Sequence, residues 1–183
     1  MKICYIVNNL NGLDGWSRHA LNIVEPIKKN GNEIICITEF LSENKIKQYR
    51  ILENPLKYLS SLFVIIKTAI KVNKIINDFR PDIIHILVEP YSTLIPFINK
   101  RSAKIVLTIC GTYAIEGLFH NWTSKILTKT YYSKIDGLIS ISKFTFNRLL
   151  KVYPNLRIKP IIIPPSINLD GVKSIKRMEN KVK

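Results

Sequence analysis

Residues 2–7 read KICYIV, an apolar run that ends at the polar, glycine-bearing loop 8–15. Helical apolar periodicity follows over 16–30, Gly31 is of the type that ends many helices, and 33–38 is a second apolar run, rich in isoleucine. Strand, loop, helix and strand in this order form a βαβ unit, and its right-handed crossover makes the two strands parallel. The opening of the chain therefore predicts the start of a parallel sheet.

The same alternation continues along the rest of the sequence. Pro26 inside the first helical run predicts a kink, and Arg80-Pro81 ends a longer helical run. Strands are expected at 82–88, 103–109, 137–141 and 159–163, and helices at 55–79, 122–133 and 143–152. This alternation predicts an α/β fold, a doubly wound, Rossmann-like parallel sheet with helices on both faces. We expect one domain over 1–168 and a basic linker or tail over 169–183.

The composition is that of a folded, basic protein. Hydrophobic residues make up 46% of the 183 and charged residues 22%, which excludes a disordered chain. Lysine and arginine total 28 against 13 aspartate and glutamate, a formal net charge of +15. This excess favours a polyanionic partner: nucleic acid, an anionic membrane face or a phosphorylated substrate. The basic residues are dispersed and form no known nucleic-acid-binding motif, so we do not expect nucleic acid.

Cysteine usage predicts a cytoplasmic protein and offers no zinc-binding spacing. Cys4, Cys36 and Cys110 are widely spaced within apolar runs, which favours reduced, buried thiols, and no C-x-x-C spacing is present for zinc. Asn8 and Asn9 interrupt the first apolar run too early for a signal peptide. No apolar stretch reaches the about 18 residues of a membrane-spanning helix.

Ligands of an open parallel sheet bind outside the carboxyl ends of its strands, which directs attention first to the loop 8–15. Gly12 and Gly15 either let backbone N–H groups approach a phosphate beside a helix N-terminus or simply make a tight turn. The dinucleotide fingerprint G-x-G-x-x-G lacks its first glycine, because Leu10 stands there, although Glu39 follows the second strand where dehydrogenases bind ribose. The missing glycine disfavours a nicotinamide-dependent oxidoreductase.

Two later strand ends carry polar residues as well. His85, within an apolar run, is either a buried histidine with a backbone partner or a ligand, and Glu89 either accepts sugar hydroxyls, acts as a base or forms a loop salt bridge. A nucleophilic Cys110 would need a cation or helix terminus that lowers its pKa, and no adjacent residue guarantees one. The catalytic candidates are Glu89, Cys110 and Glu116. The substrate-binding candidates are Gly12, Gly15, His85, Gly111, Thr112 and Ser142, the last also placed to N-cap a helix.

Six segments in this order resemble motifs of the N-terminal domain of the retaining GT-B glycosyltransferases of family 4. The first is KICYIV with its glycine loop. The others are KNGNEI at 29–34, like the family's G-H-E-V; RPDIIH at 80–85, like K-P-D-V-V-H; LTICGT at 107–112; DGLISIS at 136–142, like A-D-x-I-I-x-V-S; and IIIPPSIN at 161–168, like V-I-P-N-G-V-D. Together they span nearly the whole chain.

The resemblance implies one half of a GT-B architecture and transfer of a sugar from a nucleotide-sugar to a glycan, lipid-linked or phospholipid acceptor, with retention and without a metal or other cofactor. By matching position, Gly12 and Gly15 would approach the donor diphosphate, while Glu89 and the loop 110–116 would line the sugar and acceptor side, with Ser142 near the same crevice. Cys110 stands where the family usually has a histidine that positions the transferred sugar, so we expect weakened or retuned activity.

The resemblance also implies a partial chain. Residues 180–183 correspond to the start of the family's second domain, which grips the nucleotide, so we expect the donor-holding half to be missing. Two hypotheses follow. The chain is the acceptor half of a transferase, or it is a non-catalytic acceptor-binding or membrane-recruiting subunit that needs a separate catalytic chain.

Residues 45–80 carry eight basic side chains against two acidic ones, which fits peripheral attachment to the inner membrane face. One face of the helix 55–79 is formed by Lys67, Lys71, Lys74 and Asp78. An apolar arc around it contains Leu62, Phe63, Ile66, Ala69, Ile70 and Ile76. Either this helix binds an anionic membrane, each lysine near the surface contributing about 1 kcal/mol, or the basic face is the solvated outside of a core helix.

Overall fold

The structure, a computed structural model, describes residues 1–111, 115–116 and 122–165. Within them lies a parallel sheet of seven strands in the order β3-β2-β1-β4-β5-β6-β7. The strands are β1 (Lys2–Ile6), β2 (Glu33–Thr38), β3 (Lys47–Arg50), β4 (Ile83–Ile86), β5 (Lys104–Ile109), β6 (Gly137–Ser140) and β7 (Ile161–Ile162). The helices are α1 (Gly15–Lys29), α2 (Leu62–Phe79), α4 (Trp122–Lys134) and α5 (Lys143–Val152), with 3-10 helices η1 (Pro55–Leu59) and η2 (Glu89–Phe97).

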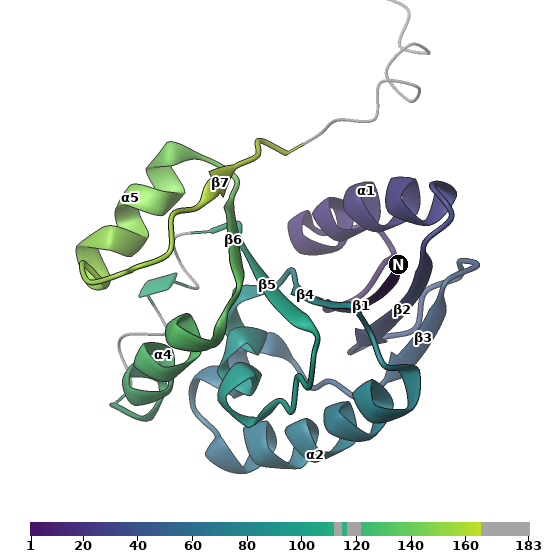
Figure 1. The fold of residues 1–183 in the computed structure, drawn as a ribbon, viewed down its shortest axis with the longest axis horizontal. Helices are drawn as coiled ribbons and strands as arrows, with labels where there is room; N and C mark the ends of the chain where they lie inside the picture. The colour runs from purple at the N-terminus through teal and green to yellow at the C-terminus, as the bar shows by residue number, and fades with distance from the viewer. Residues whose placement is uncertain (112–114, 117–121, 166–183) are drawn as a thin grey trace, which may run out of the picture.

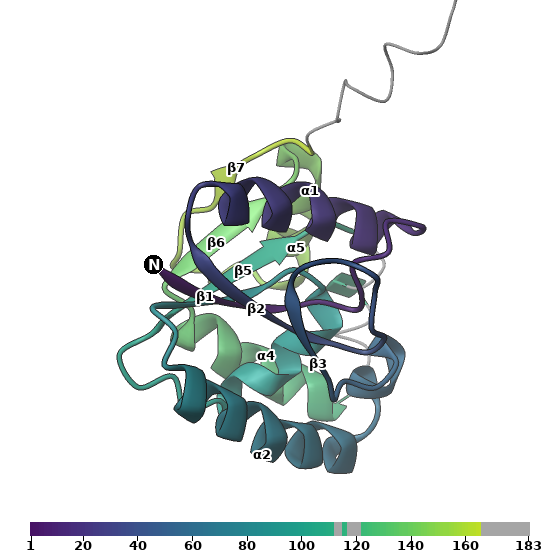
Figure 2. The same cartoon turned by 90° about the vertical axis from the view of Figure 1, so that its right-hand side faces the viewer.

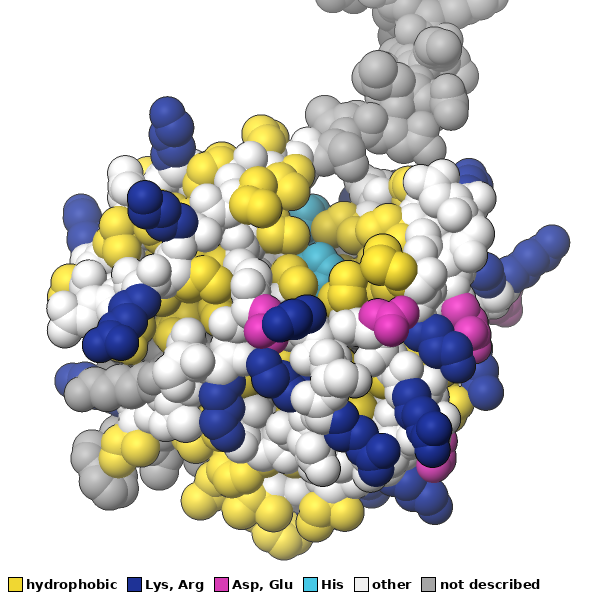
Figure 3. Space-filling view, viewed as in Figure 1, with side chains coloured by type: hydrophobic (Ala, Val, Ile, Leu, Met, Phe, Trp, Pro, Cys, Tyr) yellow, Lys and Arg dark blue, Asp and Glu magenta, His cyan; other side chains and the backbone are white. Residues whose placement is uncertain are grey.

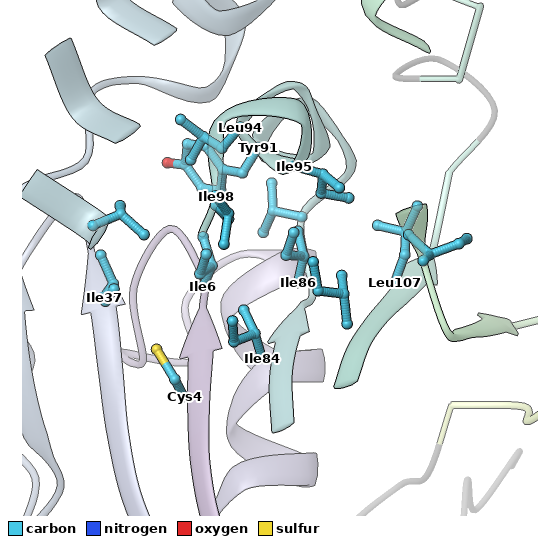
Figure 4. Packing of buried hydrophobic residues seen from close by; sticks show 14 of the residues in the cluster. Cys4, Ile6, Ile37, Ile84, Ile86, Tyr91, Leu94, Ile95, Ile98 and Leu107 are labelled. Carbon is cyan, nitrogen blue, oxygen red and sulfur yellow. The ribbon is translucent and has the colours of Figure 1, made fainter. Parts of the chain in front are cut away.

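Helices cover both faces of the sheet, which confirms the predicted doubly wound, Rossmann-like architecture. Figures 1 and 2 show α1 on one side of the strands and α2 and α4 on the other. Side chains alternate accordingly along β1: Ile3 and Tyr5 pack with α1, whereas Cys4 and Ile6 join the larger core on the opposite face. In Figure 4 the η2 side chains, Tyr91 among them, lie over the strand tips on that larger core.

The first helix ends where its sequence predicts. Asn30 is the C-terminal cap of α1, and Gly31 has a φ of +80°, a left-handed conformation that glycine adopts without a steric penalty. The helix also continues through Pro26 to Lys29.

Two elements escaped the sequence analysis. The strand β3 pairs only with β2, and its four residues are polar or aromatic and partly exposed. An edge strand of this kind has no apolar run to reveal it. The 3-10 helix η2 begins at Glu89-Pro90, shortly after β4, and seven of its nine residues are buried, so it has no alternation of polar and apolar faces to reveal it.

The single helix expected at 55–79 is wrong, because the segment forms η1 and then α2. Asn54 accepts a hydrogen bond from the backbone N–H of Leu56, which starts η1, and Pro55 fits its first turn. Ser61 then accepts from the N–H of Val64 at 3.3 Å and starts α2. Two N-capping residues, Asn54 and Ser61, therefore divide the expected helix into η1 and α2.

Replacing Ser61 by alanine removes this cap. We expect Ser61→Ala to lower the free energy of unfolding by about 1 kcal/mol and the melting temperature by roughly 2–4 °C. Thermal unfolding followed by circular dichroism measures the change. The neighbouring Ser60→Ala is the matched control, because Ser60 contributes its backbone N–H, not its side chain, to the end of η1. Equal destabilisation by both variants would show that the Ser61 hydroxyl does not cap α2.

The apolar arc expected on this helix is divided in the structure. Its members Ala69 and Ile76 are buried against the sheet, together with Ile65, Thr68 and Val72. The other four members of the arc, Leu62, Phe63, Ile66 and Ile70, face away from the core and are exposed. The helix therefore carries a second apolar surface that the protein itself leaves uncovered.

Candidate functional site

A cavity of about 830 Å³ opens at the carboxyl ends of the strands. Its wall draws on the segments that follow β1, β2, β5 and β6, on the first turns of α1 and on the approach to η1. The lining residues include Asn8, Asn9, Asp14, Gly15, Trp16, Arg18, His19, Asn22, Glu39, Phe40, Asn54, Pro55, Cys110, Gly111, Ile141 and Pro165. Figure 3 shows histidine side chains between two groups of hydrophobic side chains on the face in view. The cavity lies where a sheet of this topology binds its ligands.

The N-terminus of α1 forms one wall, and Asp14 organises it. The Asp14 carboxylate accepts from the N–H of Ser17 at 2.9 Å and from the side-chain amides of Asn8 and Asn9 at 3.3 Å. Burial alone would raise the pKa of Asp14, but these hydrogen bonds outweigh it and hold the pKa below its usual range. The loop after β1 is therefore fixed by an ionised cap.

The two glycines of this loop have different roles. Gly15 lines the cavity and has open space where a Cβ would stand. Gly12 is buried with a φ of +71°, a left-handed backbone that L side chains rarely adopt, and it packs against Leu21 and Arg18. Of the two interpretations offered by the sequence, the tight turn describes Gly12, and an open approach to a ligand remains available only at Gly15.

Glu89 is almost fully buried beside the cavity and holds its wall. Its Oε1 accepts hydrogen bonds from the backbone N–H groups of Cys110 and of Gly111, the latter at 2.6 Å, whereas its Oε2 is buried without a hydrogen-bond partner among the described residues. Burial raises the pKa of Glu89 above its usual range, and the hydrogen bonds oppose that shift. Glu89 therefore forms no salt bridge with a described residue and is not an exposed base; its hydrogen bonds hold the segment after β5 against the start of η2.

Cys110 and Gly111, which Glu89 holds, both line the cavity. The Cys110 thiol lies 4.0 Å from the carbonyl oxygen of Leu87. Burial and the Glu89 carboxylate both raise the pKa of Cys110 above its ordinary value, so the thiol stays protonated near neutral pH. This environment is the opposite of the one that activates a nucleophilic cysteine.

His85 is buried beneath α1 and does not line the cavity. Its Nε2 lies 2.8 Å from the Thr108 hydroxyl, and its ring is 5.4 Å from that of Tyr5. Burial, with a smaller contribution from His19, lowers the pKa of His85 to about 3, so the ring is neutral. The buried alternative is therefore the one present, with a threonine hydroxyl as partner rather than the expected backbone group.

The remaining candidates lie apart from the cavity wall or outside the described residues. Glu116 forms an ion pair with Arg148 of α5. Ser142 accepts from the N–H of Thr145 at 3.0 Å and N-caps α5, which confirms its predicted capping role. Thr112 lies outside the described residues.

Several lining residues were not among the sequence candidates. Arg18 and His19 lie on the first turns of α1, where the helical period gives no sign of a ligand. The Nε2 of His19 is buried without a hydrogen-bond partner among the described residues, and burial lowers the pKa of that ring. Asn8 and Asn9 follow the first strand, so the rule that ligands bind at strand ends could have predicted them as lining residues. Asn54 caps η1 and follows no strand that the sequence predicts, so only the folded structure shows that it lines the cavity.

The described part of the chain contains neither a cluster of metal ligands nor a membrane-spanning helix. No group of three or more His, Cys, Asp or Glu side chains there is arranged to hold a metal ion. No helix there is long and apolar enough to span a bilayer.

Comparison with known proteins gives a family match and a fold match. The model of Glycosyltransferase Family 4 matches residues 13–170, whereas no curated protein sequence matches the chain. A glycosyltransferase from Rickettsia africae ESF-5 has a TM-score of 0.62 at 19% identity, over 92% of this chain and 44% of its own. HepE of Anabaena, in complex with UDP-glucose, has a TM-score of 0.66 at 11% identity, over 93% and 45%. The lipopolysaccharide outer core galactosyltransferase WaaB has 0.55 at 15%, over 87% and 43%.

At these identities the solved structures establish the fold alone. That fold is one Rossmann-like half of a GT-B architecture, and the chain spans less than half the length of each of these proteins.

Proposed function

We propose, since the chain belongs to glycosyltransferase family 4, that it forms the N-terminal, acceptor-side domain of a retaining glycosyltransferase of the hexosyltransferase type. The reaction would move a sugar from a nucleotide-sugar to a glycan, lipid-linked or phospholipid acceptor. The observation that carries the proposal is the cavity at the strand ends, lined by Cys110 and Gly111 on one side and the start of α1 on the other.

The lining chemistry suits a sugar. The amides of Asn8, Asn9 and Asn54 and the carboxylate of Glu39 offer donors and acceptors for hydroxyl groups. The unpartnered Nε2 of His19 is a further group that a hydroxyl can satisfy. Trp16 adds an aromatic surface.

The same wall offers positive charge for a phosphate. Arg18 lines the cavity, so a diphosphate brought to this edge meets a guanidinium beside the N–H of Gly15, where α1 begins. The ionised Asp14 cap already takes the N–H of Ser17 and offsets the helix dipole, so the guanidinium supplies the positive charge. With these groups in place the proposal includes no metal ion and no cofactor beyond the nucleotide-sugar itself. HepE in complex with UDP-glucose supports a nucleotide-sugar as the donor.

A second domain or a partner chain completes the proposed enzyme. It would close over the cavity and hold the nucleotide, as the coverage of less than half of each solved neighbour suggests. We place the enzyme in the cytoplasm, with sugar nucleotides as its substrates, because Cys4, Cys36 and Cys110 are all free thiols.

The test starts from the coding sequence downstream of Lys183. We expect an in-frame continuation that is glycine-rich and contains an E-x7-E pattern. Protein produced with it is incubated with UDP- and GDP-sugars and a lipid extract, and the release of UDP or GDP is measured. Release by the extended protein supports the proposal. A stop codon, with no release from any donor, favours the non-catalytic subunit, and tighter binding of NADH than of every nucleotide-sugar contradicts both.

A further inference from the structure

The outward face of α2 carries an apolar strip that nothing in the described chain covers. It consists of Leu62, Phe63, Ile66 and Ile70, which we call the α2 ridge, and Phe63 is 74% and Ile70 67% exposed. At about 100° per residue these positions fall within one third of the helix circumference. Figure 3 shows a large hydrophobic patch along the lower edge of the molecule, where Figure 1 places α2.

A row of lysines borders the ridge. Lys67, Lys71 and Lys74 are exposed and follow the ridge on one side in the helical projection. The ammonium of Lys67 lies 6.0 Å from the centre of the Phe63 ring, which places a cation directly over the most exposed ridge residue. Apolar side chains and lysines thus occupy adjacent sectors of one exposed face.

The combination of an apolar ridge and a lysine row indicates which partner covers this face. A second copy of the chain packed antiparallel on this ridge would place the two lysine rows side by side, and the net charge of +15 opposes self-association in any arrangement. An anionic bilayer offers both complements, acyl chains for the ridge and lipid phosphates for the lysines, and helices with such faces lie in the membrane interface.

We propose that the α2 ridge inserts into the interfacial layer of an anionic membrane, with Phe63 and Ile70 reaching the acyl boundary and Lys67, Lys71 and Lys74 contacting lipid phosphates. The earlier electrostatic hypothesis for this helix lacked the apolar half, which appears only when four members of the predicted arc prove to be exposed.

The ridge is connected to the cavity through η1. Asn54 and Pro55 line the cavity, η1 packs against α2, and Leu56, between them and the ridge, is itself 50% exposed. Resting on the proposed function, this continuity implies that docking brings the cavity to the membrane surface and that the acceptor is carried by a lipid.

Vesicle sedimentation tests the docking without donor or acceptor. The chain is mixed with vesicles of phosphatidylcholine and phosphatidylglycerol, and with pure phosphatidylcholine vesicles. We expect binding to the mixed vesicles that the double variant Phe63→Glu/Ile70→Glu weakens by roughly tenfold or more. The variant Lys71→Glu/Lys74→Glu should lose the preference for the anionic vesicles.

Phe144 on α5 provides a matched control. Its exposed fraction of 68% is similar to the 74% of Phe63, but it lies on another helix. Phe144→Glu should therefore bind vesicles as the wild type does, and circular dichroism should show all variants folded. Wild-type binding by Phe63→Glu/Ile70→Glu would overturn the proposal. If, in addition, analytical ultracentrifugation showed a wild-type dimer that Phe63→Glu/Ile70→Glu alone disrupts, the ridge would be a contact between two copies of the chain instead.

The two proposals fail separately. Loss of lipid binding in the ridge variant, with no nucleotide release from any donor by the extended wild type, would leave a membrane-docking protein that is not a transferase. Nucleotide release with a soluble acceptor, together with no vesicle binding, would leave a transferase without this docking surface.

Discussion

Replacing Glu89 by alanine is expected to lower the free energy of unfolding by about 2–4 kcal/mol and to reduce sugar transfer by about 100-fold. The Glu89 carboxylate accepts hydrogen bonds from the backbone N–H groups of Cys110 and Gly111. Truncation leaves these buried donors without an acceptor and releases the cavity wall that they form. Urea unfolding measures the first effect, and nucleotide release from the extended protein measures the second.

Glu89→Gln is the control, because its side-chain oxygen remains an acceptor for the same N–H groups. Burial raises the pKa of Glu89, so the wild type is most stable when this carboxyl is neutral and loses stability as pH rises above its ordinary pKa. Glutamine has no charge to bury. We therefore expect the stability of Glu89→Gln relative to wild type to increase as pH rises from about 4 toward the raised pKa of Glu89. Wild-type stability of Glu89→Ala at every pH would show that this carboxylate does not hold the wall.

The sheet could be predicted because its central strands are buried on both faces. Each of the strands β1, β2, β4 and β5 has a short apolar sequence that is followed by a turn or helix signal. These four runs are enough to predict a parallel sheet. The polar edge strand β3 pairs on one side only and gives no such run. The division of 55–79 depended on Ser61, whose capping role competes with a helical period that runs straight through it.

The candidate site was only partly predictable, because strand-end position does not determine burial. Cys110, Gly111 and Gly15 follow the strand-end rule and line the cavity. Glu89 follows the same rule, but the end of β5, 21 residues further along the chain, supplies its hydrogen-bond donors and closes over it. His85 likewise faces Thr108 on the neighbouring strand. Both hydrogen-bond partners lie on or just after β5, and a single sequence does not show that β5 is the neighbour of β4.

The second large effect is expected at Gly111, where the cavity wall has room for a side chain. Among the described residues, its chain neighbours aside, no atom lies within 4 Å of the position that a Cβ would take, and its backbone does not have a positive φ. A tryptophan at this position would extend into the cavity that Gly111 lines, while the N–H that bonds Glu89 remains. We expect Gly111→Trp to reduce transfer by about 100-fold or more and to change the free energy of unfolding by less than about 1 kcal/mol.

Gly111→Ala separates occlusion from backbone effects. Its methyl group meets open space, and alanine restricts the unfolded chain, so this variant should be as stable as the wild type or more stable by about 0.4–1 kcal/mol. Because the methyl leaves most of the cavity open, transfer should fall far less than in Gly111→Trp. Nucleotide release and urea unfolding, measured on both variants, decide the matter. Full transfer by a stably folded Gly111→Trp would mean that the substrate does not occupy this cavity, and the site would have to be sought elsewhere on the sheet.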